Sequence, residues 1–163
     1  MNRVIVIGCP GSGKSVFSRA LHEKTGIPLY HLDNLYWNAD RTKVDHDVFL
    51  AKMQEILESD AWILDGNYQS TMEKRITYCD TVFFLDYPLE VCLSGVLARQ
   101  GKTRADMPWT EAPGETDAAF LSFIEQYAAQ SRPIVLSLLG RYKNREIHVF
   151  TDRAQADDFL NGL

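Results

Sequence analysis

The chain has 163 residues, of which 45% are hydrophobic and 24% charged, and its formal net charge at pH 7 is −5. This size predicts a single domain over residues 1–163, and no apolar run approaches the roughly 18–20 residues of a membrane span, so no membrane association is expected. The acidic balance argues against specific nucleic-acid binding, and the three scattered cysteines, without C-x-x-C spacing, indicate a cytoplasmic protein rather than a disulfide framework or a zinc site.

Apolar runs alternate with helical patterns along most of the chain. The apolar runs predict five strands, at residues 3–7, 28–32, 62–64, 81–85 and 147–150. The helical patterns predict helices at residues 14–24, 47–58, 88–99, 117–130, 133–142 and 154–160. Such alternation predicts an α/β protein with a five-stranded parallel sheet between two layers of helices. Residues 101–116 are rich in glycine, proline and charge, which indicates a mobile loop.

The first strand and helix enclose a phosphate-binding motif. Residues 8–15 read GCPGSGKS, a complete G-x-x-x-x-G-K-S sequence, directly after the apolar run at 4–7. Glycines let successive backbone N–H groups face one anion, Lys14 reaches the β- and γ-phosphates, and the Ser15 hydroxyl holds Mg²⁺. The residues expected to bind the nucleotide are Gly8, Pro10, Gly11, Ser12, Gly13, Lys14 and Ser15. The motif in this context predicts a three-layer P-loop NTPase fold that binds ATP and Mg²⁺.

An aspartate stands at the end of three predicted strands. Ligands of an open parallel sheet bind outside the carboxyl ends of its strands, where Asp33, Asp65 and Asp86 follow their apolar runs. Asp65 is the best candidate for a magnesium carboxylate, and Asp33 is a candidate for bonding a substrate hydroxyl. Each aspartate has the alternative role of capping the helix that follows, most clearly Asp86.

Aromatic side chains surround Asp33. Tyr30, Tyr36 and Trp37 form either a stacking platform for a ring of the substrate or the core of a small acceptor-binding lobe. His31, near the end of its strand, is either a hydrogen-bonded structural residue or a general base. Both pairs of alternatives are open at the level of the sequence.

Two later segments resemble adenylate kinases and related small-molecule kinases. Asp65, Gly66 and Asn67, with Arg75 a few residues on, resemble a D-G-x-x-R segment, although the arginine is displaced. The resemblance implies that the aspartate helps to place magnesium, the glycine lets the backbone approach the acceptor, and the arginine binds a phosphate. Residues 99–107 resemble the lid of the same enzymes, which implies a nucleotide-kinase-like protein with a lid at about 100–116.

The lid and the chain end supply further candidates. The resemblance implies that Arg99 and Arg104 close over the transferring phosphoryl group and that Arg153, beyond the last strand, lies where related kinases hold adenine. The candidate catalytic residues are therefore Lys14, Asp33, Arg99 and Arg104, and Arg99 and Arg153 join the nucleotide-binding set. The candidate substrate-binding residues are Asp33, Trp37, Asp65, Gly66, Asn67 and Arg75.

A fuller resemblance covers nearly the whole chain. The segments I-P-x-x-H-L-D at 27–33, W-I-L-D-G-N-Y at 62–68, F-L-D at 84–86 and G-K-T-R-x-D-M at 101–107 are similar to those of bacterial topology-modulation proteins, which are related to adenylate kinases. We therefore expect a kinase that moves the γ-phosphoryl group of ATP to a nucleoside, nucleotide or similar small molecule. The alternative is an ATP-binding regulatory protein, related to DNA topology, with little transferase activity.

Overall fold

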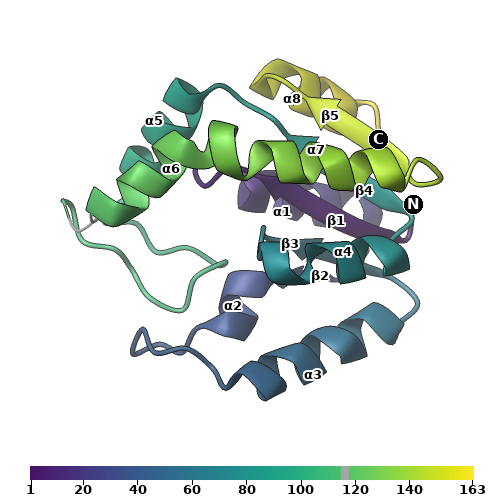
Figure 1. Cartoon of the computed structure of the whole chain (residues 1–163), viewed down its shortest axis with the longest axis horizontal. Helices are drawn as coiled ribbons and strands as arrows, with labels where there is room; N and C mark the ends of the chain where they lie inside the picture. Colours follow the sequence, from purple (N-terminus) through teal and green to yellow (C-terminus); the bar gives the residue numbers. More distant parts are fainter. Residues whose placement is uncertain (115–117) are drawn as a thin grey trace.

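The computed structural model describes residues 1–114 and 118–163. Its five strands form one parallel sheet in the order β2-β3-β1-β4-β5 (Figure 1). The strands are β1 (Arg3–Gly8), β2 (Leu29–His31), β3 (Trp62–Asp65), β4 (Thr81–Leu85) and β5 (Glu146–Phe150). The predicted five-stranded parallel sheet is confirmed.

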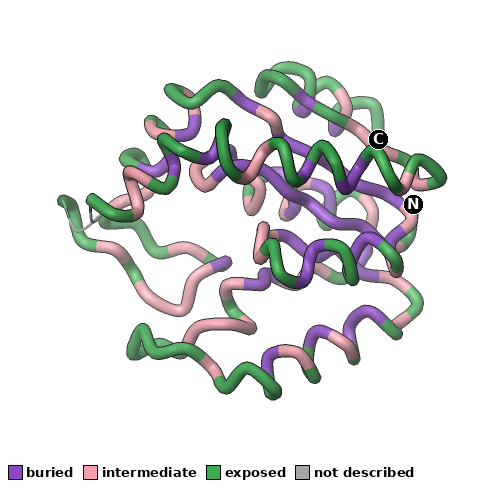
Figure 2. The backbone as a smooth tube through the Cα atoms, viewed as in Figure 1, coloured by how far each residue is buried: buried purple, intermediate pink, exposed green. Residues whose placement is uncertain are grey.

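Helices cover both faces of the sheet and complete a three-layer fold. The described helices are α1 (Lys14–Thr25), α2 (Leu32–Tyr36), α3 (His46–Glu58), α4 (Gln69–Tyr78), α5 (Leu89–Arg99), α6 (Ala118–Gln130), α7 (Arg132–Arg141) and α8 (Arg153–Asn161). Alternate strand residues face opposite layers. Val4 and Val6 pack in one core with α1, α5, α6 and α8, whereas Ile5 and Ile7 pack in the other with α3, α4 and α7. Buried residues therefore run along the central strands (Figure 2).

Two helices occur where the sequence patterns predict none. β2 ends at His31, one residue before the expected end of its strand, and Leu32 begins α2. α4 occupies a segment without a predicted element. A five-residue helix is too short to show a period of 3.6 residues. The inward face of α4 includes Thr71 and Arg75, so it lacks the apolar stripe by which amphipathic helices are recognised.

The lid segment follows α5. Residues 101–114 form turns and bends without a helix or strand, and they run toward α2 before the chain returns to α6 (Figure 1). Residues 115–117, assigned by the sequence to the end of the lid and the start of the next helix, lie outside the described residues. Among the described residues, no helix has the length and apolar character needed to cross a membrane.

The phosphate loop and α5 approach each other at two glycines. A Cβ atom added to Gly95 would lie 2.0 Å from the carbonyl oxygen of Gly11. A Cβ atom added to Gly11 would lie equally close, 2.0 Å, to the carbonyl oxygen of Cys92. The absence of side chains at both positions is what allows the helix to pack directly against the loop.

Candidate functional site

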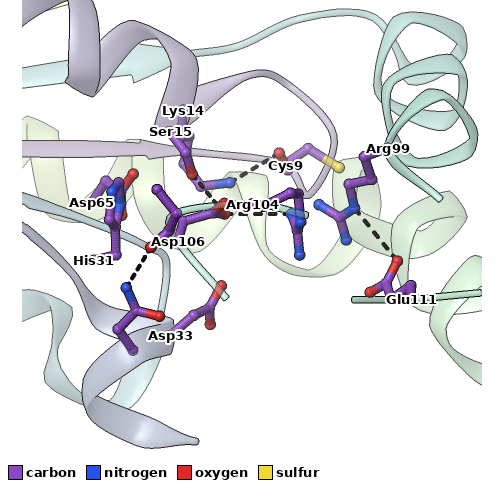
Figure 3. Close-up of polar contacts among 12 residues, drawn as sticks. Cys9, Lys14, Ser15, His31, Asp33, Asp65, Arg99, Arg104, Asp106 and Glu111 are labelled. Carbon is purple, nitrogen blue, oxygen red and sulfur yellow. Dashed lines mark hydrogen bonds and ion pairs between the residues drawn. The ribbon is translucent and has the colours of Figure 1, made fainter. Parts of the chain in front are cut away.

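A cleft of about 1020 Å³ opens at the carboxyl edge of the sheet. Its walls come from the phosphate loop, the start of α1, α2, the end of β3, α5, the lid segment, α6 and the start of α8. This is the edge at which parallel α/β sheets bind ligands, and the volume lies at the upper end for a single ligand site. Lys14, Asp33, Asp65, Arg99 and Arg104, which the sequence singles out, all line it (Figure 3).

The phosphate loop has the backbone geometry that its glycines permit. Gly11 and Gly13 have φ angles of 83° and 93°, in the left-handed region that favours glycine. The ammonium group of Lys14 donates to the carbonyl oxygens of Gly8 and Cys9, at 2.9 and 3.2 Å. Burial lowers the pKa of Lys14, and the nearby carboxylates of Asp65 and Asp33 oppose that shift. The cation therefore sits at the base of the cleft, where an anionic ligand would relieve its desolvation.

Asn67 fastens the phosphate loop to the loop that follows β3. Its Nδ2 donates to the carbonyl oxygen of Gly8 at 2.6 Å, and its Oδ1 accepts from the N–H of Gly8 at 3.1 Å. Gly66 and Asn67 line the cleft, as the sequence led us to expect. The paired contact to Gly8 was not foreseen, and it gives the Asn67 amide a positioning function.

Arg75 lies beneath the same loop rather than on the wall of the cleft. Its side chain is fully buried and donates to the carbonyl oxygens of Gly66, Asn67 and Tyr68. Burial lowers the pKa of its guanidinium to about 10. The structure thus places this predicted phosphate ligand where it holds the β3–α4 loop from below.

Asp65 and His31 form a buried pair at the ends of β3 and β2. His31 Nδ1 and Asp65 Oδ1 are 2.9 Å apart, while Oδ2 of Asp65 is buried without a hydrogen-bond partner. Burial of the imidazole is outweighed by the hydrogen bond and charge of Asp65, so the pKa of His31 is raised. His31 is therefore a hydrogen-bonded residue that orients Asp65. Asp65 and Ser15 line the same cleft, and an unpaired carboxylate oxygen there fits a bound cation.

Asp33 stands in the cleft next to the hydroxyl group of Tyr68, which donates to it. Burial raises the pKa of Asp33, and the hydrogen bond from Tyr68 and the charge of Lys14 act against that rise. A carboxylate with a raised pKa that faces a cleft has the properties of a group that accepts a proton or orients a hydroxyl.

The lid segment reaches the phosphate loop through Asp106. The Ser15 hydroxyl donates to Oδ2 of Asp106 at 2.8 Å, and Arg104 lies 3.3 Å from the same oxygen (Figure 3). The Asn34 amide donates to the carbonyl oxygen of Ala105 at 2.6 Å and joins the lid to α2. Asp106 belongs to the quoted lid motif, but its buried contact with Ser15 was not predicted.

The two remaining candidate cations, Arg99 and Arg153, also line the cleft. Arg99 faces Glu111 at 3.8 Å, and burial together with the charge of Arg104 lowers its pKa. Arg153 begins α8, lies over the Tyr87 ring and donates to the carbonyl oxygen of Ser12 at 3.5 Å. Arg153 is thus next to the phosphate loop.

The candidate residues are distributed over both halves of the cleft. The half of the cleft beside the phosphate loop is lined by Pro10, Gly11, Gly13, Lys14, Ser15, Arg99 and Arg153, whereas Gly8 and Ser12 of the loop are buried and do not line it. The other half, which we call the aromatic end, is lined by Trp37, Arg41, Tyr68 and Trp109 next to Asp33. Only Trp37 of these four was singled out from the sequence as a ligand-binding residue.

The curated proteins similar in sequence to the chain are adenylate kinases. No model of a known protein family matches the chain. An adenylate kinase from Thermotoga maritima is 30% identical over 122 residues, which make up 71% of this chain and 54% of that protein. An adenylate kinase from Thermotoga petrophila is 29% identical over the same shares, 71% and 54%. The chain therefore spans about half the length of the curated relatives it matches.

Comparisons of structure agree on the fold. A shikimate kinase from Bacteroides thetaiotaomicron superposes with a TM-score of 0.64 over 99% of this chain and 95% of its own, at 16% identity. A shikimate kinase from Acinetobacter baumannii, solved in complex with shikimate, gives 0.64 over 99% and 90%, at 15% identity. The chain thus has the P-loop fold of small-molecule kinases and is similar in sequence to adenylate kinases.

Proposed function

We propose that the protein is a kinase that transfers the γ-phosphoryl group of ATP to a small molecule such as a nucleoside or nucleotide. The observation that supports this most is that one cleft brings together the phosphate loop, two lid arginines and Asp33. A protein that only binds ATP needs the first of these but not the other two. Transfer of a phosphoryl group is catalysed mainly by positioning and by neutralising charge, which these residues supply.

Each half of the cleft has its own task in this proposal. Loop amides and Lys14 hold the phosphates of ATP, and Arg153 lies on the side of the loop where adenine would rest. Arg99 and Arg104 neutralise charge that spreads over the equatorial oxygens during transfer. Asp33 accepts a hydrogen bond from a hydroxyl of the acceptor and orients it toward the γ-phosphorus. The residues proposed to line the acceptor subsite are Trp37, Asp65, Gly66 and Asn67, with Arg75 holding their loop in place.

Ser15 and Asp65 are proposed to hold Mg²⁺. The donors fit, because a hydroxyl at the start of α1 and an unpaired buried carboxylate oxygen face the same cleft. Among the described residues, no group of three acidic, histidine or cysteine side chains forms a complete cage. That fits Mg²⁺, which proteins usually bind through one or two side chains together with water and substrate phosphates. When bound, the ion offsets negative charge on the phosphates.

The proposals on cellular location, nucleic-acid binding and the topology-modulation group rest on the sequence. We propose a cytoplasmic protein without a specific nucleic-acid partner, in keeping with the net charge of −5. Membership of the topology-modulation group is supported by the motifs alone. The regulatory alternative differs in an observable way: ADP release by a kinase rises with an acceptor, whereas a regulator hydrolyses ATP slowly and indifferently to any acceptor.

Replacing Lys14 with alanine tests the ATP site. We expect the dissociation constant for ATP with Mg²⁺, measured by calorimetry, to rise more than about tenfold, or about 1.4 kcal/mol. Lys24→Ala is the matched control, because Lys24 is an exposed lysine of the same helix. An unchanged affinity in a folded Lys14→Ala protein would remove the ATP site from the proposal.

Replacing Arg99 or Arg104 with alanine tests the lid. Because these cations are proposed to contact charge that develops during transfer, we expect kcat to fall far more than the affinity for ATP. Arg141→Ala, a change at an exposed arginine of α7 outside the cleft, serves as the control. Turnover equal to that of the parent in both lid variants would contradict a catalytic lid.

A further inference from the structure

Two tryptophans from distant parts of the chain meet at the aromatic end of the cleft. Trp37 follows α2 and Trp109 belongs to the lid segment; their ring centroids are 5.4 Å apart and their planes meet at 86°. Both side chains are partly exposed, and both line the cleft. Two perpendicular rings form a corner that presents one flat face and one edge to a ligand.

The corner is connected to the proposed acceptor carboxylate by further aromatic contacts. Trp37 meets Tyr36 edge-on at 4.9 Å, and Tyr36 meets Tyr68 at 4.8 Å. The Tyr68 hydroxyl then donates to Asp33. A ring resting in the corner would therefore lie on the same side of the cleft as the group that orients the acceptor.

The loop beside Trp37 has a backbone conformation that needs support. Arg41 has a φ of 67°, which is uncommon for a residue other than glycine. Two backbone hydrogen bonds hold the turn. The N–H group of Asn38 donates to the carbonyl oxygen of Thr42 at 2.8 Å, and the N–H group of Arg41 donates to the carbonyl oxygen of Asn38 at 3.0 Å. It places the Arg41 guanidinium 5.8 Å from the centre of the Trp109 ring. Backbone outliers held in this way gather at ligand sites.

We propose that the acceptor carries a planar, unsaturated ring and that Trp37 and Trp109 select it. The inference rests on the proposed function, which it deepens by naming the chemical class of the acceptor. A planar ring makes close contact with the flat face of an aromatic side chain. Such stacking changes affinity by about tenfold or more. A saturated polyol, in contrast, is recognised through many hydrogen bonds, and the corner offers two largely apolar rings.

Calorimetry with a chosen panel tests the inference. The probes are the ring compounds adenosine, cytidine and thymidine and the saturated compounds ribose, inositol and glycerol, each with a non-hydrolysable ATP analogue and Mg²⁺ present. We expect the parent to bind at least one ring compound and to bind the saturated compounds at least about tenfold more weakly. Trp109→Ala should weaken ring binding by about tenfold or more, while Trp109→Phe retains most of it.

Two controls separate a lost contact from a lost fold. Leu97→Ala removes an exposed apolar side chain of α5 that does not line the cleft, so ring binding should be unchanged. Fluorescence gives a second measurement, because Trp62 is fully buried in β3 and a change on ring binding therefore reports the two tryptophans of the corner. Trp109→Phe should reduce that change.

The outcomes are distinct from those for the proposed function. Equal ring affinity in the parent, Trp37→Ala and Trp109→Ala overturns the inference, and so does a parent that binds no ring compound or prefers the saturated ones. In each of these cases the affinity for the ATP analogue is unaffected. The proposed function itself fails if the parent does not bind that analogue, or if no acceptor of any class increases ADP release.

Discussion

Asp33→Asn should lower the rate of phosphoryl transfer by about 10²–10⁴-fold, the usual contribution of a positioned acid–base group. The amide keeps an oxygen that can accept from Tyr68 but cannot take a proton from the acceptor. The affinity for ATP, measured by calorimetry, should stay close to that of the parent. In the parent, the transfer rate should fall with decreasing pH through the raised pKa of Asp33, at a higher pH than for an ordinary aspartate.

Stability provides the control for this variant. Since burial raises the pKa of Asp33, the folded state binds a proton more tightly than the unfolded state. The protein therefore loses stability as pH rises from the pKa of Asp33 in the unfolded state to its higher pKa in the folded state. At neutral pH the neutral asparagine should therefore unfold at an equal or higher denaturant concentration than the parent. A variant that folds well and transfers phosphoryl groups at the parental rate would exclude Asp33 from the chemistry.

Gly95→Ala should destabilise the protein by about 1–3 kcal/mol or more, because overpacking of a close contact forces the backbone to move. The new Cβ atom would lie 2.0 Å from the carbonyl oxygen of Gly11. Relief requires α5 or the phosphate loop to shift, so the affinity for ATP should fall as well. Denaturant unfolding and calorimetry with an ATP analogue measure the two effects.

Gly140→Ala is the matched control for this change. Gly140 lies in α7. Apart from its chain neighbours and the nearby backbone of α7, no heavy atom lies within 4 Å of the position that a Cβ atom would take. Alanine is a better helix former than glycine, so this variant should gain up to about 1 kcal/mol. If Gly95→Ala is as stable as Gly140→Ala and binds the ATP analogue normally, α5 does not pack against the loop as described.

The parts of the site that could be predicted from the sequence are those encoded locally. The phosphate loop needs a strand, a glycine-rich turn and a helix in succession, and all three are visible in residues 3–25. Asp33 and Asp65 could be placed at one edge because parallel strands end together. The positions of the five strands along the chain and the approximate bounds of the main helices follow from the same apolar patterns.

The parts that could not be predicted depend on contacts between distant segments. Asn67 bonds to a residue 59 positions away, and Ser15 bonds to one 91 positions away. Nothing in the local sequence distinguishes these side chains from other polar residues of loops. The position of Arg75 after an aspartate–glycine pair indicates a phosphate ligand, whereas its burial on the inward face of α4 depends on how that helix packs. Trp109 lies in a segment whose composition indicates only an irregular loop.

The double contact between Asn67 and Gly8 has a thermodynamic consequence for the order in which substrates bind. One end of this contact belongs to the loop proposed for ATP, and the other to the loop proposed for the acceptor. A ligand that shifts Gly8 therefore shifts Asn67, and the reverse holds equally. Linkage requires each substrate to change the affinity of the other by the same factor, so cooperative binding of the two would be equal in either order of addition.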